Sequence, residues 1–299
     1  MEKIEPMLAS KFSGDLENFD NSDYIVENKW DGTRLIVDTT GDSVKAYTRN
    51  GKDRTEDVWY VIKDLQDVDG CIFDGEFVFL DNKGVSQFKP IHTSKSKILE
   101  EGLVPKYKVF DLIASNGESI KRKPLEKRKS KLSRKLYFLD DDDRVEKAEY
   151  QKGGGDKDFG EIFSKVREEG REGLILKKLD SIYKEDNRGR SWQKIKDFKE
   201  TEVRVFGVQE GDNRLIGALL VRSKEGSYLG KVGTGFSSED EMERVKNNLI
   251  EADERILSEK KIGEEYTPVE EFLIDVKYQE ITNSGKLRSP VFLKIREDK

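Results

Sequence analysis

The sequence is poor in the residues that form covalent cross-links or bind soft metal ions. Among its 299 residues it has one cysteine, Cys71, and one histidine, His92. A single cysteine excludes an internal disulfide, and these two residues are too few ligands for a zinc site. Because Cys71 precedes Ile72 and Phe73 in a strand-like run, we expect a buried thiol rather than a reactive one.

Long apolar runs are also missing. No stretch approaches the roughly 18 apolar residues of a membrane-spanning helix, and the N-terminus lacks a basic flank followed by an apolar segment. Hydrophobic residues make up 34% of the chain, which suffices for buried cores, whereas 39% charged residues predict an extensively solvated surface. We therefore expect a soluble cytoplasmic protein with no membrane partner.

The sequence also has no excess of positive charge. Its 55 Lys and Arg residues are outnumbered by 61 Asp and Glu residues, which gives a formal net charge of −6. This balance argues against indiscriminate binding to nucleic acid, so any such contact has to come from a local patch. The best candidate is the run from Lys121 to Lys135, in which only Glu126 is acidic. Two interpretations of this run stay open, a solvated helix face and a phosphate-binding surface.

The most informative stretch is Glu27-Asn28-Lys29-Trp30-Asp31-Gly32-Thr33-Arg34, in which a lysine and an aspartate lie two residues apart. Apolar runs at 24–26 and 35–37 predict a β-strand on either side, so the loop between them has a rigid support. We interpret Lys29 as a nucleophile, whose amine has to be desolvated or placed near other cations to lose its proton. A plain hairpin turn at Asp31-Gly32 is the structural alternative.

Five later segments follow this stretch in a fixed order, as strand-like runs that carry charged residues. They are Phe73-Asp74-Gly75-Glu76-Phe77, Lys106-Tyr107-Lys108-Val109-Phe110-Asp111, Glu172-Gly173-Leu174-Ile175-Leu176-Lys177-Lys178, Ser191-Trp192-Gln193-Lys194-Ile195-Lys196 and Arg288-Ser289-Pro290-Val291-Phe292-Leu293-Lys294-Ile295-Arg296. In order and type the six segments resemble the motifs of the covalent nucleotidyltransferases, and most closely those of the ATP-dependent DNA ligases. The resemblance covers nearly the whole chain, and six ordered matches are far more specific than any single one.

The resemblance implies an enzyme that seals nicks between a 3′-hydroxyl and a 5′-phosphate in duplex DNA, through a lysine-AMP intermediate and a DNA-adenylate. It implies roles in replication, repair or recombination, ATP as the AMP donor, and Mg²⁺, which Mn²⁺ can replace. The scarcity of cysteine removes the zinc module of the NAD-dependent ligases, which also favours ATP. Because a ligase works alone on one nick, we expect a monomer.

The resemblance also implies a role for each motif residue. The catalytic residues would be Lys29, Asp31, Lys194 and Lys196. The ATP-binding residues would be Glu27, Arg34, Glu76, Phe110, Glu172, Lys194, Lys196, Arg288 and Arg296. Glu76 and Glu172 would hold Mg²⁺, and Arg34 and Arg49 would contact DNA. From the residues themselves, Phe110 is suited to stacking on a purine, and Lys194 and Lys196 lie on one face of a strand.

After Lys196 the pattern changes to short apolar strands with one helical segment, from Ser238 to about Ile256, which suits a small OB-fold barrel. We predict an α+β chain with two domains. Residues 1–197 would form a nucleotidyltransferase (adenylation) domain of antiparallel sheets with flanking helices, and residues 198–299 an OB-fold domain. We expect a compact form of the family, in which the large N-terminal DNA-binding domain and the DNA-encircling loop of some members are absent. The Lys121 to Lys135 run is a candidate for replacing them.

Two other functions remain open. RNA ligases and mRNA capping guanylyltransferases share the Lys-x-Asp-Gly loop, although Arg288-x-Pro-x-Phe, Arg296 and the segment 231–236 resemble the DNA ligase C-terminal domain more closely. A non-catalytic nucleic-acid-binding module would use the same lysines only to contact phosphates. Such a module predicts no covalent adduct and unchanged affinity when Lys29 is replaced.

Overall fold

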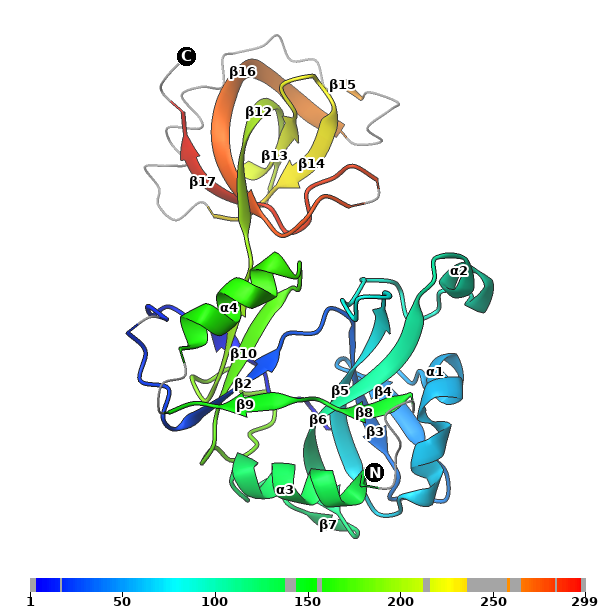
Figure 1. The fold of residues 1–299 in the computed structure, drawn as a ribbon. Helices are drawn as coiled ribbons and strands as arrows, with labels where there is room; N and C mark the ends of the chain where they lie inside the picture. Colours follow the sequence, from blue (N-terminus) through cyan, green and yellow to red (C-terminus); the bar gives the residue numbers. More distant parts are fainter. Residues whose placement is uncertain are drawn as a thin grey trace. The chain divides into compact units, whose positions relative to one another are not determined.

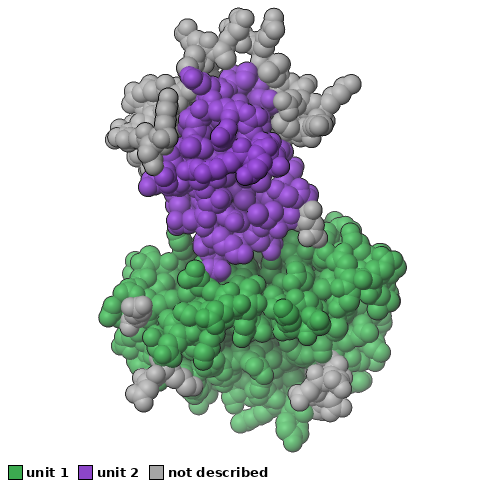
Figure 2. Space-filling model, turned by 45° about the horizontal axis from the view of Figure 1, so that its top comes forward, with its two compact units in different colours: residues 1–196 green, residues 197–299 purple. Residues whose placement is uncertain are grey.

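The computed structural model describes residues 4–16, 18–137, 144–154, 158–211, 216–235, 257–258, 265–282 and 284–296. The chain divides into two compact units, residues 1–196 and residues 197–299 (Figure 2). The helix predicted for residues 238–256 lies outside the described residues. Within the described part of the chain, no helix has the length and apolar content needed to cross a membrane.

Two mainly antiparallel sheets form the framework of the first unit (Figure 1). The first sheet has the order β1-β11-β10-β2-β9, with β1 Ser10–Lys11, β2 Tyr24–Asn28, β9 Tyr150–Lys152, β10 Gly173–Lys178 and β11 Trp192–Lys196. The second has the order β4-β3-β5-β6-β7, with β3 Thr33–Asp38, β4 Lys45–Thr48, β5 Ile72–Leu80, β6 Val104–Ser115, β7 Glu118–Ser119, and β8 Val145–Lys147 beside β6. The pairings β1–β11 and β6–β8 are parallel, which departs from the all-antiparallel prediction.

The described residues of the first unit also include four α-helices and one 3-10 helix. They are α1 Thr55–Ile62, η1 Lys63–Asp67, α2 Lys95–Glu100, α3 Leu125–Lys135 and α4 Phe159–Glu168. Phe159 and Val166 of α4 pack with Val26 and Leu174 of the first sheet. The α4 helix starts where Asp158 accepts a hydrogen bond from the Gly160 N–H, and just beyond its end Gly170 adopts a φ of +71°.

A separate apolar cluster joins the two sheets of the first unit. Ile36, Phe110 and Ile113 enter it from the second sheet, and Trp192 enters it from the first. Burial of each such side chain contributes roughly 1.5–3 kcal/mol, which holds the facing sheets together. Phe110 and Trp192 meet edge to face, with ring centroids 6.2 Å apart. This cluster therefore fixes the relative position of two strands that carry predicted site residues.

The loop at Lys29 connects the two sheets. Strand β2 pairs with β10 and β9, whereas β3 pairs with β4 and β5, so the two consecutive strands are not partners. The hairpin alternative for Asp31-Gly32 is therefore wrong. A Cβ on Gly32 would lie 2.1 Å from the carbonyl oxygen of Phe77, so close backbone approach accounts for the glycine.

The second unit contains a curved antiparallel sheet (Figure 1). Its strands run β14-β13-β12-β16-β15, with β17 beside β16, and comprise β12 Lys199–Glu210, β13 Ile216–Arg222, β14 Tyr228–Val232, β15 Leu257–Ser258, β16 Glu265–Tyr278 and β17 Val291–Ile295. The prediction of short strands is wrong for β12 and β16, which have 12 and 14 residues. They pair with each other from Lys199–Tyr278 to Val208–Thr267. Polar residues within this ladder interrupt the apolar pattern, which is why the strands were predicted to be shorter. Val203, Leu219, Ile274 and Phe292 are buried in the core.

Candidate active site

A pocket of about 210 Å³ lies in the first unit, where the Lys29 loop crosses between the sheets. Seven residues predicted for the site line it: Glu27, Lys29, Arg34, Arg49, Glu76, Phe110 and Lys194. Residues from five segments of the sequence are thus brought to one place. The pocket wall carries more cationic than acidic side chains, which suits an anionic ligand.

Glu172 lies between two of the predicted catalytic lysines. Lys29 directly follows β2, and its N–H donates to the Gly173 carbonyl at 2.9 Å. Its Nζ is 2.5 Å from Glu172 Oε2, while Lys196 Nζ is 3.0 Å from Glu172 Oε1. Burial works to raise the pKa of Glu172, but Lys29 and Lys196 outweigh it, so that pKa lies below its ordinary value. The carboxylate is therefore held ionised beside the proposed nucleophile.

Lys194 and Lys196 extend from β11 opposite β10, where Lys194 is in register with Ile175 and Lys196 with Gly173. Two residues apart on a strand, they lie on one side of the sheet, as predicted. Burial lowers the pKa of Lys194, and the nearby charges of Arg188, Lys196 and Lys29 add to that effect. Lys194 thus sits among other cations, where an anion would be stabilised.

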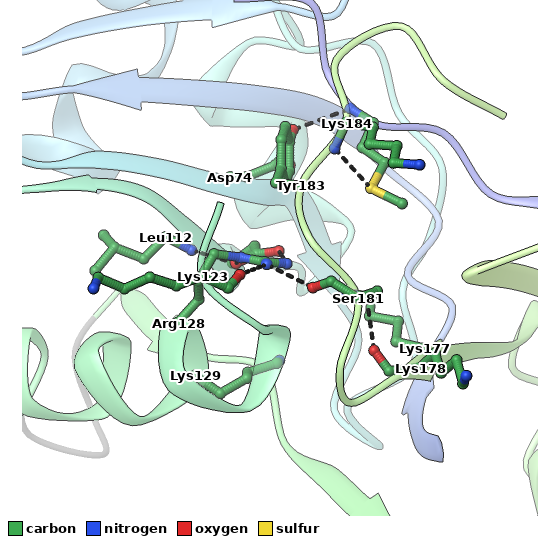
Figure 3. Close-up of polar contacts among 12 residues, drawn as sticks. Asp74, Leu112, Lys123, Arg128, Lys129, Lys177, Lys178, Ser181, Tyr183 and Lys184 are labelled. Carbon is green, nitrogen blue, oxygen red and sulfur yellow. Dashed lines mark hydrogen bonds and ion pairs between the residues drawn. The ribbon is translucent and has the colours of Figure 1, made fainter. Parts of the chain in front are cut away.

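Arg34 is held by protein groups rather than projecting freely into the pocket. Its guanidinium donates to both carboxylate oxygens of Asp74, at 2.5 and 2.6 Å, and to the Met7 carbonyl at 3.2 Å. The Tyr183 hydroxyl donates to Asp74 at 2.6 Å, and the two side chains are labelled side by side in Figure 3. Asp74 and Tyr183 were not among the predicted site residues. They fix the guanidinium 4.6 Å from the centroid of the Phe110 ring.

Glu76 faces Arg34 across the β3–β5 ladder. Burial raises the pKa of Glu76 to about 8, with Glu172 and Asp74 adding to the rise and Lys29 and Arg34 opposing it. A divalent cation would compensate these neighbouring carboxylates. Mg²⁺ is commonly bound by one or two carboxylates together with substrate phosphates and waters, so the acidic pair Glu76 and Glu172 fits that ion.

Two residues that the sequence analysis did not predict lie beside Phe110 in the pocket lining. Trp192 and Lys177 both line the pocket, and they are in register across β10 and β11. Lys177 Nζ lies 4.2 Å from the ring centroid of Phe110 and 4.1 Å from a ring centroid of Trp192. The two-residue period of a strand could have indicated them, because Lys177 lies on the same face of its strand as Ile175, and Trp192 on the same face as Lys194.

The run from Lys121 to Lys135 was predicted to be either a solvated helix face or a phosphate-binding surface. Neither prediction holds for two of its side chains, which are buried. Arg128 and Lys129 on α3 are 0% and 1% exposed. Arg128 donates to both carboxylate oxygens of Asp111 at 2.8 Å, and to the Ser181 carbonyl at 2.9 Å (Figure 3). Lys129 forms an ion pair with Glu27 Oε1, and Lys177 Nζ is 2.7 Å from Glu27 Oε2. These two basic residues therefore form ion pairs inside the unit rather than at its surface.

Asp31 lies outside the pocket lining, whereas Arg49 lies in its exposed wall. The Asp31 N–H donates to Ser86 Oγ at 3.0 Å, and Asp31 is not among the residues that line the pocket. Arg49 is an exposed residue of the pocket wall, in the turn after β4, which closes at Gly51 with a φ of +76°.

The two C-terminal arginines belong to the second unit and are engaged there. Arg288 Nη1 is 2.8 Å from Glu280, and Arg296 lies 3.4 Å from Asp275 and 3.8 Å from Glu202.

Comparisons with known proteins show the family of the chain. Residues 6–196 match the family model of the ATP dependent DNA ligase domain, and residues 212–299 match that of the ATP dependent DNA ligase C terminal region. The chain is 31% identical over 290 residues to the SPbeta prophage-derived DNA ligase-like protein LigB of Bacillus subtilis, covering 97% of both chains. It is 29% identical to a DNA ligase of Thermococcus onnurineus, of which it spans 56%.

Two solved structures are also similar. A mycobacterial DNA ligase D complexed with ATP and MES is 29% identical, with a TM-score of 0.54 and coverage of 99% of this chain and 96% of that one. A Lig E DNA ligase is 21% identical, with a TM-score of 0.68 and coverage of 97% and 98%, and supports the fold alone. The predicted order of a nucleotidyltransferase domain and an OB-fold domain is confirmed.

Proposed function

The chain belongs to the ATP-dependent DNA ligase family, and on that premise we propose that it seals nicks in duplex DNA through a covalent AMP adduct on Lys29. The observation that carries this proposal is the position of the Lys29 side chain. It lies in a pocket with six other predicted residues and contacts Glu172, which in turn contacts Lys196. A lysine in such a site is placed for nucleophilic attack on a phosphorus atom.

In the first step, deprotonated Lys29 Nζ forms a bond to the α-phosphorus of ATP, and the bond from that phosphorus to the bridging oxygen breaks to release pyrophosphate. Lys194 and Lys196 neutralise the developing negative charge. Arg288 and Arg296 of the second unit orient the departing pyrophosphate, for which they exchange their contacts with acidic residues of that unit for contacts with phosphate. Asp31 assists the later transfer to DNA.

In the second step, an oxygen of the DNA 5′-phosphate attacks the AMP phosphorus and the bond to Lys29 breaks. In the third, the 3′-hydroxyl oxygen loses its proton and attacks the 5′-phosphorus, and AMP departs. Arg49 at the pocket wall is suited to hold the 5′-phosphate, and Arg34 lines the same wall. Each step moves one phosphoryl bond, so correct positioning accounts for much of the rate.

Glu27 and Phe110 bind the adenine of ATP, because an aromatic face stacks on a base and a carboxylate accepts its amino group. Glu76 and Glu172 would hold Mg²⁺. When bound there, the ion neutralises phosphate charge and orients the phosphates for in-line displacement. The raised pKa of Glu76 is consistent with this assignment, since a buried carboxyl beside other acidic groups gains most from a compensating cation.

A nick-sealing assay tests the proposal. The substrates are a duplex with a labelled 5′-phosphate at a nick, the same duplex with a 5′-hydroxyl, and an all-RNA duplex with a nick. We expect the wild type to join only the 5′-phosphate DNA with ATP, and the Lys29→Ala variant to join none. Joining of the RNA substrate alone would replace DNA ligase by RNA ligase. Failure of the wild type to join any of them would refute a ligase function.

A further inference from the structure

Helix α3 contacts both sheets of the first unit through two adjacent basic residues. Arg128 binds Asp111, the residue after Phe110 on the second sheet, and Lys129 binds Glu27 on the first sheet. Figure 3 shows Arg128 and Lys129 together on α3, with Arg128 directed toward the Ser181 carbonyl. The helix therefore connects β6, which carries Phe110, with β2, which carries Glu27.

Glu27 forms ion pairs with two lysines, one through each carboxylate oxygen. Lys177, which lines the pocket, takes one carboxylate oxygen, whereas Lys129, which is absent from the pocket lining, takes the other. Lys129 Nζ also lies 5.0 Å from the centroid of the Tyr150 ring, and Tyr150 is the register partner of Glu27 on β9. Each carboxylate oxygen thus faces one ammonium group in an ion pair, and the two charges together restrain the direction of the carboxylate. Without Lys129, the carboxylate would be free to rotate toward Lys177.

A buried carboxylate does not need two lysines for neutrality. Glu27 is 3% exposed, and one ammonium group, that of Lys177, already balances its charge. Burying a second ammonium group costs free energy that the ion pair only partly returns. A buried surplus charge of this kind calls for a role other than neutralisation. Orientation of Glu27 is such a role, because the direction of its lone pairs decides which hydrogen-bond donor it accepts.

We propose that Lys129 is a positioning residue that orients Glu27 and thereby sets the preference of the pocket for an adenine base. This inference rests on the proposed function, in which Glu27 accepts a hydrogen bond from the 6-amino group of ATP. Guanine carries a carbonyl oxygen at that position, and a fixed carboxylate repels it. Lys129 itself does not touch the nucleotide. Its effect is confined to binding, since the base is remote from the phosphorus that reacts.

The test compares Lys129→Met with Lys127→Met, a matched change of an exposed lysine on the same helix. The rate of adduct formation on Lys29 is measured against the concentrations of ATP and GTP with Mg²⁺ present. Loss of a contact that is equal in the ground state and the transition state raises KM and leaves kcat unchanged. For Lys129→Met we expect a KM for ATP raised by about tenfold or more, kcat within about threefold, and a preference for ATP over GTP reduced by about tenfold. Lys127→Met should match the wild type.

A structural role alone would give a different result. In that case the thermal midpoint of Lys129→Met shifts while its KM for ATP and its ATP preference stay at the wild-type values, and the inference is overturned. If Lys129→Met does not fold, Lys129→Gln keeps a hydrogen-bond donor without the charge. We expect it to raise the KM for ATP by about threefold or more, and an unchanged KM would equally overturn the inference. Absence of any adduct on the wild type would instead refute the proposed function itself.

Discussion

The ammonium group of Lys29 lies 2.5 Å from a carboxylate oxygen of Glu172, whose other oxygen is 3.0 Å from Lys196. An ammonium group in this ion pair has no lone pair, so the contact has to open, or the proton has to leave, before attack. In the proposed mechanism, Glu172 therefore holds Lys29 in place before the first step. A change at Glu172 should therefore affect the proposed reaction of Lys29 with ATP.

The Glu172→Gln variant tests this link. It removes the charge that holds Lys29 and Lys196 and one of the proposed Mg²⁺ ligands, so we expect the rate of Lys29 adenylation to fall by about 100-fold or more. Glu168→Gln, an exposed change at the end of α4, is the control. Adenylation of Glu172→Gln within about threefold of the wild-type rate would remove Glu172 from the mechanism.

The proposed role of Arg49 in DNA binding can be tested separately from the chemistry on ATP. It is an exposed residue of the pocket wall, suited to holding the 5′-phosphate of the nick. We expect Arg49→Ala to form the AMP adduct at nearly the wild-type rate and to seal nicks about tenfold or more slowly, because loss of one phosphate contact costs about 1–3 kcal/mol. Lys52→Ala, in the same turn, should seal normally. Equal losses in both steps would contradict a role in DNA binding.

The ion pair between Arg128 and Asp111 predicts a large loss of stability. Both side chains are fully buried, so Arg128→Met leaves an uncompensated carboxylate and should lower the free energy of unfolding by about 3–5 kcal/mol. The double variant Arg128→Met with Asp111→Leu should recover most of that loss. Urea unfolding followed by tryptophan fluorescence reports on the first unit alone, since Trp30, Trp59 and Trp192 all lie in it. The exposed change Arg134→Met is the control, and a loss below about 1 kcal/mol for Arg128→Met would contradict the prediction.

Stability should also depend on pH through Lys177. The pKa of Lys177 is lowered to about 8, mainly by burial; Glu27 opposes the shift and Lys129 adds to it. Between pH 8 and the ordinary lysine pKa near 10.4, the unfolded chain binds more protons at this residue than the folded chain, so stability from Lys177 rises with pH.

The same urea experiment on the wild type and Lys177→Met isolates this contribution. The free energy of unfolding of the wild type minus that of the variant should increase between pH 8 and pH 10, by at most about 1.4 kcal/mol per pH unit. A difference that is constant or falls with pH would show that Lys177 does not titrate in this way.

The sequence alone predicted seven of the fifteen residues that line the pocket, because motif order and strand patterns are local signals. Lys29, Glu76 and Lys194 each lie on or beside an apolar strand, and strands of this kind are recognisable one at a time. The partners of these residues depend on contacts between distant segments. Tyr183, which holds Asp74, lies in an irregular segment, and no periodicity marks it.

Other features were hidden because local patterns were misleading. A run rich in Lys and Arg predicts a solvated face, and nothing in it indicates that Arg128 and Lys129 have buried acidic partners on two different strands. Consecutive strands usually pair, so the crossing between β2 and β3 was not evident from the sequence. Glutamates and Pro268 interrupt the apolar pattern of β16, which made that strand seem short.

The most direct test of the central claim is the intact mass of the protein after incubation with Mg²⁺ and ATP. The protein is first treated with pyrophosphate to remove any bound AMP, and GTP and NAD are run in parallel on the wild type and Lys29→Ala. We expect a gain of one AMP with ATP only, absent in Lys29→Ala. A GMP adduct would point to capping chemistry, and no adduct with any nucleotide would contradict a lysine-AMP mechanism.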